Sequence, residues 1–368
     1  METLRVIDAD THVDETDDTW AYVPSEEEEL KPTTGYPRNP RPDLPLSRYW
    51  VVDGHRKQRK VRDDVRSQTT EAQRELLDVE ARLRHMDELG TEIQVIYPTL
   101  FLVEPATRPE AELTITRSYN RWLAERCALS HGRLRWVCVP PLRNMDEALE
   151  ELSFAKDHGA CGVLKKGDRE ADKWPSDPYF FPLYEEAERL DLPMCIHTGT
   201  GTPDFTSTLE VGPGFMRGKG PVINGAFALA QGRIPQRFPK LRFGFVEAGA
   251  SWVPLVHYSL KRGHETFDRS GGAEFARAIG KEPRYEAADD VFKANRFYIT
   301  CQVDEDLPML LNYISEDNLL VGSDYTHQDQ SQEHGFVPKL RERAERGDIP
   351  QSAVKKIVYD NPKAFYGL

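Results

Sequence analysis

Short, almost continuously hydrophobic runs recur along the chain, with helix-like stretches between them. Each run has the length of a strand and is rich in Val, Ile, Leu, Phe or Cys, which is typical of parallel strands buried on both faces. The eight runs span residues 4–8, 92–98, 134–140, 161–166, 192–198, 241–247, 295–300 and 318–324. Strands that alternate with helices in this way predict an α/β fold, a (β/α)₈ barrel rather than a doubly wound sheet.

Amphipathic helical patterns fill the segments between the runs. The stretch 71–90 ends on Gly90, a residue suited to terminate a helix. The other helical patterns cover residues 112–130, 146–159, 180–191 and 350–368. Because one barrel of about 250 residues with insertions accounts for the length of the chain, we predict a single domain over residues 1–368.

The longest departure from this alternation is the segment 16–70, an insertion between the first two strands. It is charged and rich in proline, and contains PSEEEEL, TTGYPRNPRPDLP and GHRKQRKVRDDVR. One interpretation is a solvated surface excursion. The other is a cap over the barrel mouth, because loops that follow the strands emerge where barrel enzymes keep their active sites. The sequence leaves both interpretations open.

Charge and composition exclude several classes of function. A formal net charge of −13 argues against a nucleic-acid-binding surface and gives no reason to expect binding to an anionic membrane. The sequence has no apolar run of transmembrane length and no N-terminal pattern of a secretory signal. Its five cysteines are widely spaced, as is typical of reduced core thiols. We therefore expect a cytoplasmic protein with neither nucleic acid nor membrane as a partner.

Side chains that can bind metal or move protons follow several of the predicted strands. The first run leads into Asp10 and His12, and later runs end at His197, Glu247 and Asp324. Asp10 and His12 are two residues apart on an extended chain, so they share a face. The carboxyl ends of barrel strands surround one mouth, where these groups can converge on a cation. Imidazole and carboxylate ligands together suit Zn²⁺, Mn²⁺ or Fe²⁺.

Four stretches also resemble a known family. VIDADTH, CIHTGTG, RFPKLRFGFVEAGASWVP and LLVGSDYTHQDQS occur in this order and are similar to motifs of the amidohydrolase superfamily. The closest branch includes aminocarboxymuconate-semialdehyde decarboxylase and the γ-resorcylate and 5-carboxyvanillate decarboxylases. RHMDELGTEIQVIYPTLF, SYNRWLAERC and DNPKAFYGL extend the resemblance over nearly the whole chain outside the insertion.

The resemblance implies a distorted barrel that holds one divalent ion. Its ligands would be Asp10, His12, His197 and Asp324, with zinc as the first expectation and manganese as the second, because mixed nitrogen and oxygen ligands admit both. Asp324 would lie beside the metal-bound water or substrate and act as a base or proton carrier. Family habit also favours a homodimer.

Two positions bear on the catalytic assignment. Glu247 stands where many members of the family have a histidine at the end of the sixth strand. A glutamate can act as a general base, but it repels a substrate carboxylate unless it is protonated or neutralised by the metal. His327 can supply the missing imidazole or be an ordinary loop histidine, and both interpretations stay open.

Four further residues are candidate substrate contacts. Lys165 ends the fourth strand, where it can bind a substrate anion or form an ion pair with Glu247 or Asp324. Tyr97 ends the second strand, and Trp174 and Arg217 lie in segments that follow strands. Tyr97, Trp174 and Arg217 each have an ordinary structural interpretation as well.

The resemblance implies metal-dependent, non-oxidative decarboxylation of a small aromatic or unsaturated carboxylic acid. The main alternative is a metal-dependent hydrolase of an amide, lactone or C–C bond, in which Glu247 and Asp324 would generate hydroxide from metal-bound water. A hydratase is a third possibility. An inert barrel that serves as a binding module belongs to another class, and the presence of all four candidate ligands argues against it.

Overall fold

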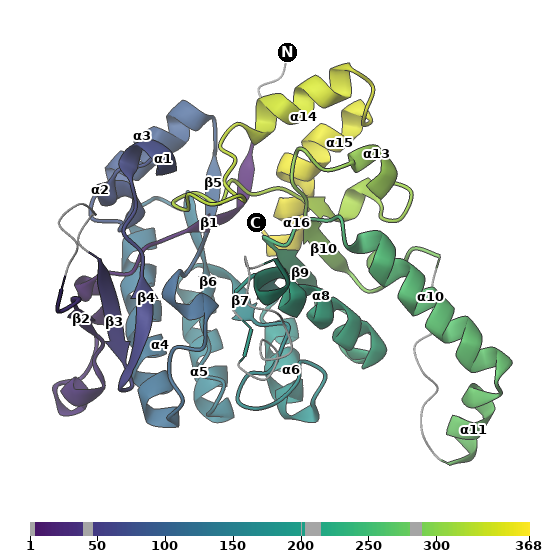
Figure 1. Cartoon of the computed structure of the whole chain (residues 1–368), viewed down its shortest axis with the longest axis horizontal. Coiled ribbons are helices and arrows are strands. Elements are labelled where there is room, and N and C mark those ends of the chain that lie inside the picture. The colour runs from purple at the N-terminus through teal and green to yellow at the C-terminus, as the bar shows by residue number, and fades with distance from the viewer. Residues whose placement is uncertain (1–3, 40–46, 200, 203–214, 280–288) are drawn as a thin grey trace. The chain divides into compact units, whose positions relative to one another are not determined.

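The computed structural model describes residues 4–39, 47–199, 201–202, 215–279 and 289–368 (Figure 1). The chain divides into two compact units, each built from segments that are distant in sequence. Unit 1 comprises Met1–Leu164, Gly322–Phe336 and Leu368, and unit 2 comprises Lys165–Val321 and Val337–Gly367.

Unit 1 carries parallel strands joined by helices. The strands are β1 (Ile7–His12), β5 (Ile93–Tyr97), β6 (Leu134–Cys138) and β7 (Ala160–Lys165, whose last residue begins unit 2), paired in this order. The connecting helices are α2 (Glu71–Arg74), α3 (Val79–Leu89), α4 (Pro109–Ala128) and α5 (Met145–Asp157), with the 3₁₀ turn η3 (Leu100–Leu102) after β5. All six residues of β1 are buried, although four of them are polar.

The segment 322–336 returns to unit 1 and runs along β1. The backbone N–H of Asp324 donates to the carbonyl of Asp10 at 3.0 Å, and that of His12 donates to the carbonyl of Tyr325 at 2.9 Å. Strand β1 is therefore flanked by β5 on one side and by this segment on the other. The pairing gives hydrogen-bond partners to the backbone of β1. It also places the segment of Asp324 beside the strand that carries Asp10 and His12.

The insertion folds into a small antiparallel sheet of β2 (Thr33–Gly35), β3 (Arg48–Val52) and β4 (His55–Arg59), seen together in Figure 1. Asp53 and Gly54, both with positive φ, form the two-residue turn between β3 and β4. Trp50 is buried, and the guanidinium of Arg59 lies 4.0 Å above its ring. The short helices of this region are η1 (Asp17–Trp20), η2 (Ser25–Leu30) and α1 (Asp64–Ser67). The insertion thus has a buried aromatic centre of its own.

Unit 2 repeats the strand and helix alternation. Its strands β8 (Met194–His197), β9 (Phe243–Val246), β10 (Phe297–Thr300) and β11 (Leu319–Leu320) are parallel and paired in this order. Its helices are α6 (Phe181–Arg189), α8 (Phe215–Gln231), α9 (Ile234–Arg237), α10 (Val253–Arg269), α11 (Gly272–Ala278), α12 (Val291–Ala294), α13 (Leu307–Leu310), α14 (Phe336–Glu345), α15 (Gln351–Lys355) and α16 (Asn361–Tyr366). Short turns η4 (Pro178–Phe180) and η5 (Glu316–Asn318) and a π-helical turn (Lys356–Asp360) complete it.

The eight strands follow the order β1-β5-β6-β7-β8-β9-β10-β11 in one parallel sheet, with helices between successive strands. The predicted (β/α)₈ barrel class is therefore confirmed. No helix among the described residues is both long and apolar enough to cross a membrane.

Two predicted helices are interrupted. The stretch 71–90 is divided into α2 and α3, because Leu76 is left-handed (φ 51°) and Asp78 caps a new helix by accepting from the N–H of Ala81. The predicted closing helix 350–368 contains a π-helical turn just before Pro362. Proline has no N–H for an α-helical hydrogen bond, so the change of helical pitch at this point has a local cause.

Candidate metal centre

Unit 1 gathers four titratable side chains at the end of β1. His12 Nε2 lies 3.4 Å from Asp10 Oδ1 and 3.4 Å from Asp324 Oδ1. His327 Nδ1 lies 2.7 Å from the same oxygen of Asp324. Ligand atoms of His12, Asp324 and His327 all fall within 4.8 Å of one another, and all four residues are buried. Groups of this kind at this spacing can surround a single cation.

The orientation of His12 suits a metal ligand. Its Nδ1 lies 2.9 Å from the carbonyl oxygen of Pro98, which can only accept a hydrogen bond. The Nδ1 atom therefore carries the proton, and Nε2 presents its lone pair toward the carboxylates of Asp10 and Asp324. A backbone carbonyl in this position fixes the tautomer and ring angle of many metal-binding histidines.

The structure places His327 against Asp324 rather than in an isolated loop. Its ring is stacked on that of His12, with centroids 3.9 Å apart, and it is only 3% exposed. Its Nε2 lies 3.4 Å from Thr99 Oγ1, whose hydroxyl donates to the carbonyl of Val13 at 2.9 Å. The Thr99 oxygen is thus free to accept from Nε2–H, which leaves Nδ1 directed at Asp324.

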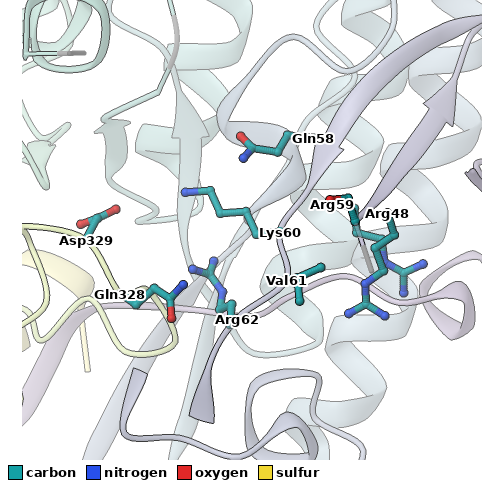
Figure 2. Close-up of a pocket in the computed structure, with 9 residues that line it drawn as sticks. Arg48, Gln58, Arg59, Lys60, Val61, Arg62, Gln328 and Asp329 are labelled. Carbon is teal, nitrogen blue, oxygen red and sulfur yellow. The ribbon is translucent and has the colours of Figure 1, made fainter. Parts of the chain in front are cut away.

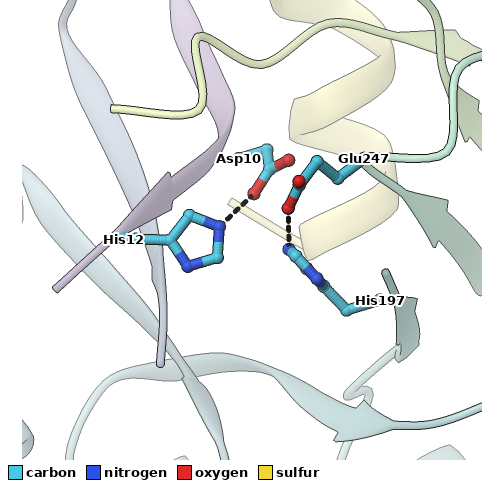
Figure 3. Close-up of side chains that lie close together, drawn as sticks. All are labelled: Asp10, His12, His197 and Glu247. Atoms are coloured by element: carbon cyan, nitrogen blue, oxygen red, sulfur yellow. Dashed lines mark ion pairs between the residues drawn. The ribbon is translucent and has the colours of Figure 1, made fainter. Parts of the chain in front are cut away.

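Unit 2 supplies a second pair of candidate groups at the ends of β8 and β9. His197 Nε2 lies 3.6 Å from Glu247 Oε2, and its Nδ1 donates to the carbonyl of Thr198 at 2.8 Å. His197 therefore shows the same arrangement as His12, with Nδ1 on a carbonyl oxygen and Nε2 directed toward a carboxylate. Figure 3 shows the two ion pairs, Asp10 with His12 and His197 with Glu247.

Two residues of these clusters, and Thr326 beside them, have a strained backbone. Glu247 (φ 59°), Asp324 (φ 52°) and Thr326 (φ 87°) occupy the left-handed region, which favours glycine. The backbone N–H of Glu247 is held by Thr300 Oγ1 at 2.8 Å. Strain of this kind persists where surrounding contacts impose it, and it concentrates at functional sites.

Glu15 supports the loop that carries Thr99. Its carboxylate accepts the backbone N–H groups of Thr99 at 2.9 Å and Leu100 at 3.0 and 2.9 Å. Burial is the main cause that raises the pKa of Glu15 to about 7, against the lowering effect of these hydrogen bonds. Glu15 acts on the site through Thr99, the residue that meets His327.

The four predicted substrate contacts have different surroundings. The buried ring of Tyr97 lies 6.0 Å from that of His12. The ammonium of Lys165 forms an ion pair with Glu170 and lies 4.0 Å above the ring of Phe180. Trp174 is 45% exposed, and Arg217 is exposed on α8. Their contact with a substrate stays a prediction.

The sequence analysis missed Thr99, which follows β5 by two residues. Its position after a strand end was a usable signal, because side chains in such segments face the mouth of a barrel. Threonine was passed over since it is neither strongly acidic nor basic. Its hydroxyl nevertheless fixes which nitrogen of His327 faces Asp324.

Comparison with known proteins identifies the family. The sequence model of the family described as Amidohydrolase matches residues 7–368. The chain belongs to the amidohydrolase family. Among curated relatives, γ-resorcylate decarboxylase of Rhizobium sp. (strain MTP-10005) is 31% identical over 140 residues, which are 36% of this chain and 43% of that protein. This amidohydrolase thus matches less than half the length of that relative.

Solved structures share the fold of this amidohydrolase over nearly its whole length. An amidohydrolase from Mycobacterium avium subsp. paratuberculosis K-10 has a TM-score of 0.76 at 19% identity, covering 100% of this chain and 99% of the other. A dihydroxybenzoic acid decarboxylase from Polaromonas sp. JS666, with bound manganese and the inhibitor 2-nitroresorcinol, has a TM-score of 0.63 at 18% identity, covering 99% and 97%. At these identities the likeness shows the fold alone.

Proposed function

We propose that this amidohydrolase is a metal-dependent, non-oxidative decarboxylase of a small aromatic or unsaturated carboxylic acid. The observation that carries the proposal is the cluster of His12, Asp324 and His327 beside Asp10, in a chain whose curated match is a γ-resorcylate decarboxylase. The relative with bound manganese and 2-nitroresorcinol supports it, because that inhibitor is an aromatic ring with neighbouring oxygen substituents.

The proposed metal ligands are Asp10, His12, His197 and Asp324. The two histidines fit this role because each has its Nδ1 on a backbone carbonyl and its Nε2 directed toward a carboxylate. This mixed set of nitrogen and oxygen donors suits Mn²⁺ or Zn²⁺. When bound, the divalent ion would supply Lewis-acid polarisation of a carboxylate and an adjacent oxygen.

We infer that Asp324 and His327 move the proton that decarboxylation consumes. In its imidazolium form, which carries a proton on each nitrogen, His327 can pass the Nδ1 proton over 2.7 Å to Asp324, which delivers it to the ring or alkene carbon that bears the carboxylate. The protonated carbon leaves an electron-poor system, so the electrons of the breaking C–C bond flow into it as CO₂ departs. A hydrogen thus replaces the carboxylate, without an oxidant or reductant.

Burial of these residues favours this chemistry. His12 is fully buried, and Asp10 and Asp324 are 3% and 1% exposed. Charges in such a site interact more strongly than in water, because bulk solvent does not screen them. A substrate carboxylate that loses its hydration here is destabilised relative to neutral CO₂.

Release of labelled CO₂ tests the proposal. Manganese- or zinc-loaded protein would be incubated with ortho-hydroxybenzoates and enoic acids that carry ¹³C in the carboxyl group. We expect ¹³CO₂ from at least one acid, and deuterium at the vacated carbon when the reaction runs in D₂O. Failure of the whole panel with fully metal-loaded protein would contradict decarboxylation.

Hydrolysis is the second candidate function, and Glu247 is the observation that favours it. Its carboxylate lies 3.6 Å from His197 Nε2, where a carboxylate can act as a base toward water. In H₂¹⁸O a hydrolase places ¹⁸O in a product carboxylate, whereas a hydratase places it in a new hydroxyl group. A decarboxylase incorporates no ¹⁸O into the organic product.

We further propose that a homodimer performs this reaction and that Tyr97, Lys165, Trp174 and Arg217 contact the substrate. Family resemblance supports the dimer, and the position of Tyr97 beside His12 supports its own assignment. Light scattering coupled to size-exclusion chromatography measures the oligomeric state. Alanine variants of the four residues, assayed for KM and kcat separately, test the substrate contacts.

A further inference from the structure

Asp8 is a buried carboxylate of β1 that neither the proposed metal ligands nor the proposed proton transfer uses. It is 1% exposed and is the second residue of the strand, before Asp10 and His12. Removing an ionisable group from water is costly unless hydrogen bonds replace the lost hydration. The hydrogen-bond partners of this carboxylate therefore indicate what Asp8 does in the fold.

Ser323, the residue directly before Asp324, donates two hydrogen bonds to Asp8. Its backbone N–H donates to Asp8 Oδ1 at 2.8 Å, and its hydroxyl donates to Asp8 Oδ2 at 2.5 Å. The two bonds join both oxygens of one carboxylate to both donors of one residue, and a two-point contact fixes direction as well as distance. Strand β1 thus holds the residue that precedes a candidate ligand.

The carbonyl group of Ser323 is held as well. It accepts the backbone N–H of Glu333 at 2.9 Å. All three polar groups of Ser323 therefore have partners within unit 1, two of them on Asp8. Ser323 is also buried, with 1% of its surface exposed. The peptide that leads into Asp324 is consequently restrained from several directions.

Asp324 needs such a restraint, because its backbone is left-handed (φ 52°). A conformation of this kind persists only where surrounding contacts impose it. The backbone N–H of Asp324 donates to the carbonyl of Asp10 at 3.0 Å, and its carbonyl accepts the N–H of His327 at 3.0 Å. Together with the contact at Ser323, these bonds direct the Asp324 carboxylate toward His12 Nε2, 3.4 Å away.

The same segment is less enclosed after the site. Residues 323–327 are buried, whereas residues 328–330 are exposed. Gln328 and Asp329 line one side of a polar cavity of about 610 Å³, which the insertion lines on the other side (Figure 2). Packing restrains the chain less at this cavity, so the buried residues before it, Ser323 among them, set the position of the candidate ligand.

We propose that Asp8 is a positioning residue that sets the orientation of Asp324 through Ser323. In this role the Asp8 carboxylate touches neither substrate nor metal, and it acts on the reaction by holding the proton carrier in place. The inference rests on the proposed function, because that function gives Asp324 its part as ligand and proton carrier.

Three single variants test the path from Asp8 to Asp324. D8A leaves both donors of Ser323 without an acceptor, so the Kd for Mn²⁺ should rise about 10–100-fold, as for other residues that orient metal ligands. D8N removes the charge, but its amide can accept from the N–H of Ser323 and donate to the hydroxyl oxygen. The Kd of D8N should therefore stay within about threefold of the wild type. S323A loses one of the two bonds, and its Kd should lie between those of D8N and D8A. Competitive titration with a chelating indicator measures these values.

The double variant D8A/S323A tests whether Asp8 acts through Ser323. If it does, the double variant should bind Mn²⁺ no more weakly than D8A, because the contact between the two residues is already lost in D8A. Effects of the two substitutions that multiply would show that each residue acts on its own, which contradicts the inference.

Crystal structures of the metal-free variants give a measurement that does not depend on activity. In the wild type, Asp324 Oδ1 lies 3.4 Å from His12 Nε2. This separation should increase by about 1 Å in D8A and remain unchanged in D8N, and a displacement of that size is enough to lower kcat at least about tenfold at saturating Mn²⁺. If D8A does not fold, S323A decides, because it should show a smaller displacement and a weaker affinity than the wild type.

Glu151 provides the control. It is a fully buried carboxylate of α5 that accepts from Asn120 Nδ2 at 2.9 Å and from Arg121 Nη1 at 2.6 Å, both on α4. The variant E151A removes a buried, hydrogen-bonded carboxylate from the same unit. It should lose stability in urea unfolding and keep the Kd for Mn²⁺ and the position of Asp324.

These results separate the inference from the proposed reaction. A wild-type position of Asp324 in D8A and S323A, or a D8N variant as weak in metal binding as D8A, overturns the inference. If no acid releases CO₂ but D8A displaces Asp324 and D8N does not, the positioning role stands and decarboxylation fails. If acids release CO₂ and D8A keeps the wild-type Kd and kcat, decarboxylation stands and the positioning role fails. The metal-free structures decide the positioning role even if the wild type binds no metal.

Discussion

The guanidinium of Arg82 donates a hydrogen bond from Nη1 to the backbone carbonyl of His12 at 2.8 Å. Its Nη2 donates to Thr11 Oγ1 at 3.2 Å, and its Nε donates to Gln94 Oε1 at 2.9 Å. The ring of Tyr325 lies 4.4 Å from the guanidinium carbon. Arg82 is fully buried. Its contacts join β1, which carries Asp10 and His12, to the segment that carries Asp324.

Replacing Arg82 should loosen the proposed metal site. The variant R82M leaves the carbonyl of His12 and its neighbours without a buried donor, at a cost of about 1–3 kcal/mol in the free energy of unfolding. We also expect metal affinity to fall about 10–100-fold, as for other residues that orient metal ligands. R82K keeps the charge without the planar fork and should be intermediate. Urea unfolding and competitive metal titration give the two quantities.

Arg296 is the matched control for this experiment. Its guanidinium donates to backbone carbonyls of unit 2, among them those of Leu241 at 2.9 Å and Phe238 at 3.1 Å, and to no candidate ligand. R296M should lose stability and retain metal affinity. An R82M protein that binds metal as tightly as the wild type would show that Arg82 serves stability alone.

Gly322 packs directly against Asp10. A Cβ at position 322 would lie 2.2 Å from Asp10 Cβ and 2.8 Å from its backbone nitrogen. The variant G322A should therefore push β1 aside at a proposed metal ligand, with a cost of about 1–3 kcal/mol for overpacking and weaker metal binding. Thermal unfolding and metal titration measure both effects.

Gly263 provides the control for this substitution. It lies in α10, and an added Cβ would meet no other atom within 4 Å. G263A should stabilise the protein by about 0.5–1 kcal/mol, because alanine favours a helix more than glycine does. If G322A were as harmless as G263A, the close packing of Asp10 would have no role in the site.

The strand pattern and the proximity of Asp10 and His12 could be predicted, because the first follows from burial and the second from the alternation of side chains along a strand. The hydrophobic run at the start marked the core, although the strand begins at Ile7 and continues to His12. Its polar half weakened the hydrophobic signal. The polar half of the strand is nevertheless hydrogen-bonded to neighbours on both sides. Asp10 and His12 share one face as predicted, with His12 Nε2 and Asp10 Oδ1 3.4 Å apart.

Long-range contacts set the limit of prediction. Whether His327 reaches the site depends on the turn after Asp324, in which Asp324 and Thr326 are left-handed, the latter against the preference of a β-branched residue. The partner of Lys165 is Glu170, in the loop that follows its own strand. Neither outcome follows from local propensity, because surrounding contacts override it.

The insertion contained a signal that the sequence analysis did not use. Asp53-Gly54 lies between two segments of strand length, and such a pair is a strong local indication of a two-residue hairpin. The burial of Arg59 against Trp50 was not accessible in the same way. Hydrophobic patterns assign arginine to the surface, and only the folded sheet shows which cation an aromatic ring covers.

Asp324 should carry the proton transfer. Asparagine at this position keeps the shape and hydrogen-bonding capacity but cannot hold the transferable proton, so D324N should lower kcat about 10²–10⁴-fold. H327N removes the group that lies 2.7 Å from Asp324 and should reduce kcat by a smaller factor. Metal content must be measured for each variant. A metal-loaded D324N that retains more than a tenth of wild-type kcat would contradict the assignment.

Removal of metal should lower both activity and stability. Asp10 and Asp324 each lie 3.4 Å from His12 Nε2, so their carboxylates gather in a buried space that a cation would neutralise. At a free metal concentration of 100 Kd, binding adds about 2.7 kcal/mol to the free energy of unfolding. Chelation should remove this increment, and Mn²⁺ or Zn²⁺ should restore it. In the double variant D10N/H12A the chelator should have no effect on unfolding.

His334 should make the metal-free protein sensitive to acid. Its ring is stacked on Tyr325 at 5.4 Å and stands edge-on to His85 at 6.2 Å. Burial, and then the neighbouring His85, lower the pKa of His334 to about 4, below the ordinary 6.5. Between these values the unfolded chain binds a proton that the folded chain does not, so stability is present above pH 6.5 and is lost as the pH falls toward 4.

This linkage amounts to about 2 kcal/mol at pH 5. Urea unfolding of the metal-free protein at pH 7.5 and pH 5 should therefore show a smaller loss for H334F than for the wild type, because phenylalanine keeps the stacking on Tyr325 without a titrating nitrogen. H55Q, at an exposed position of β4, should lose as much stability as the wild type. Equal losses in H334F and the wild type would assign the acid sensitivity to other groups.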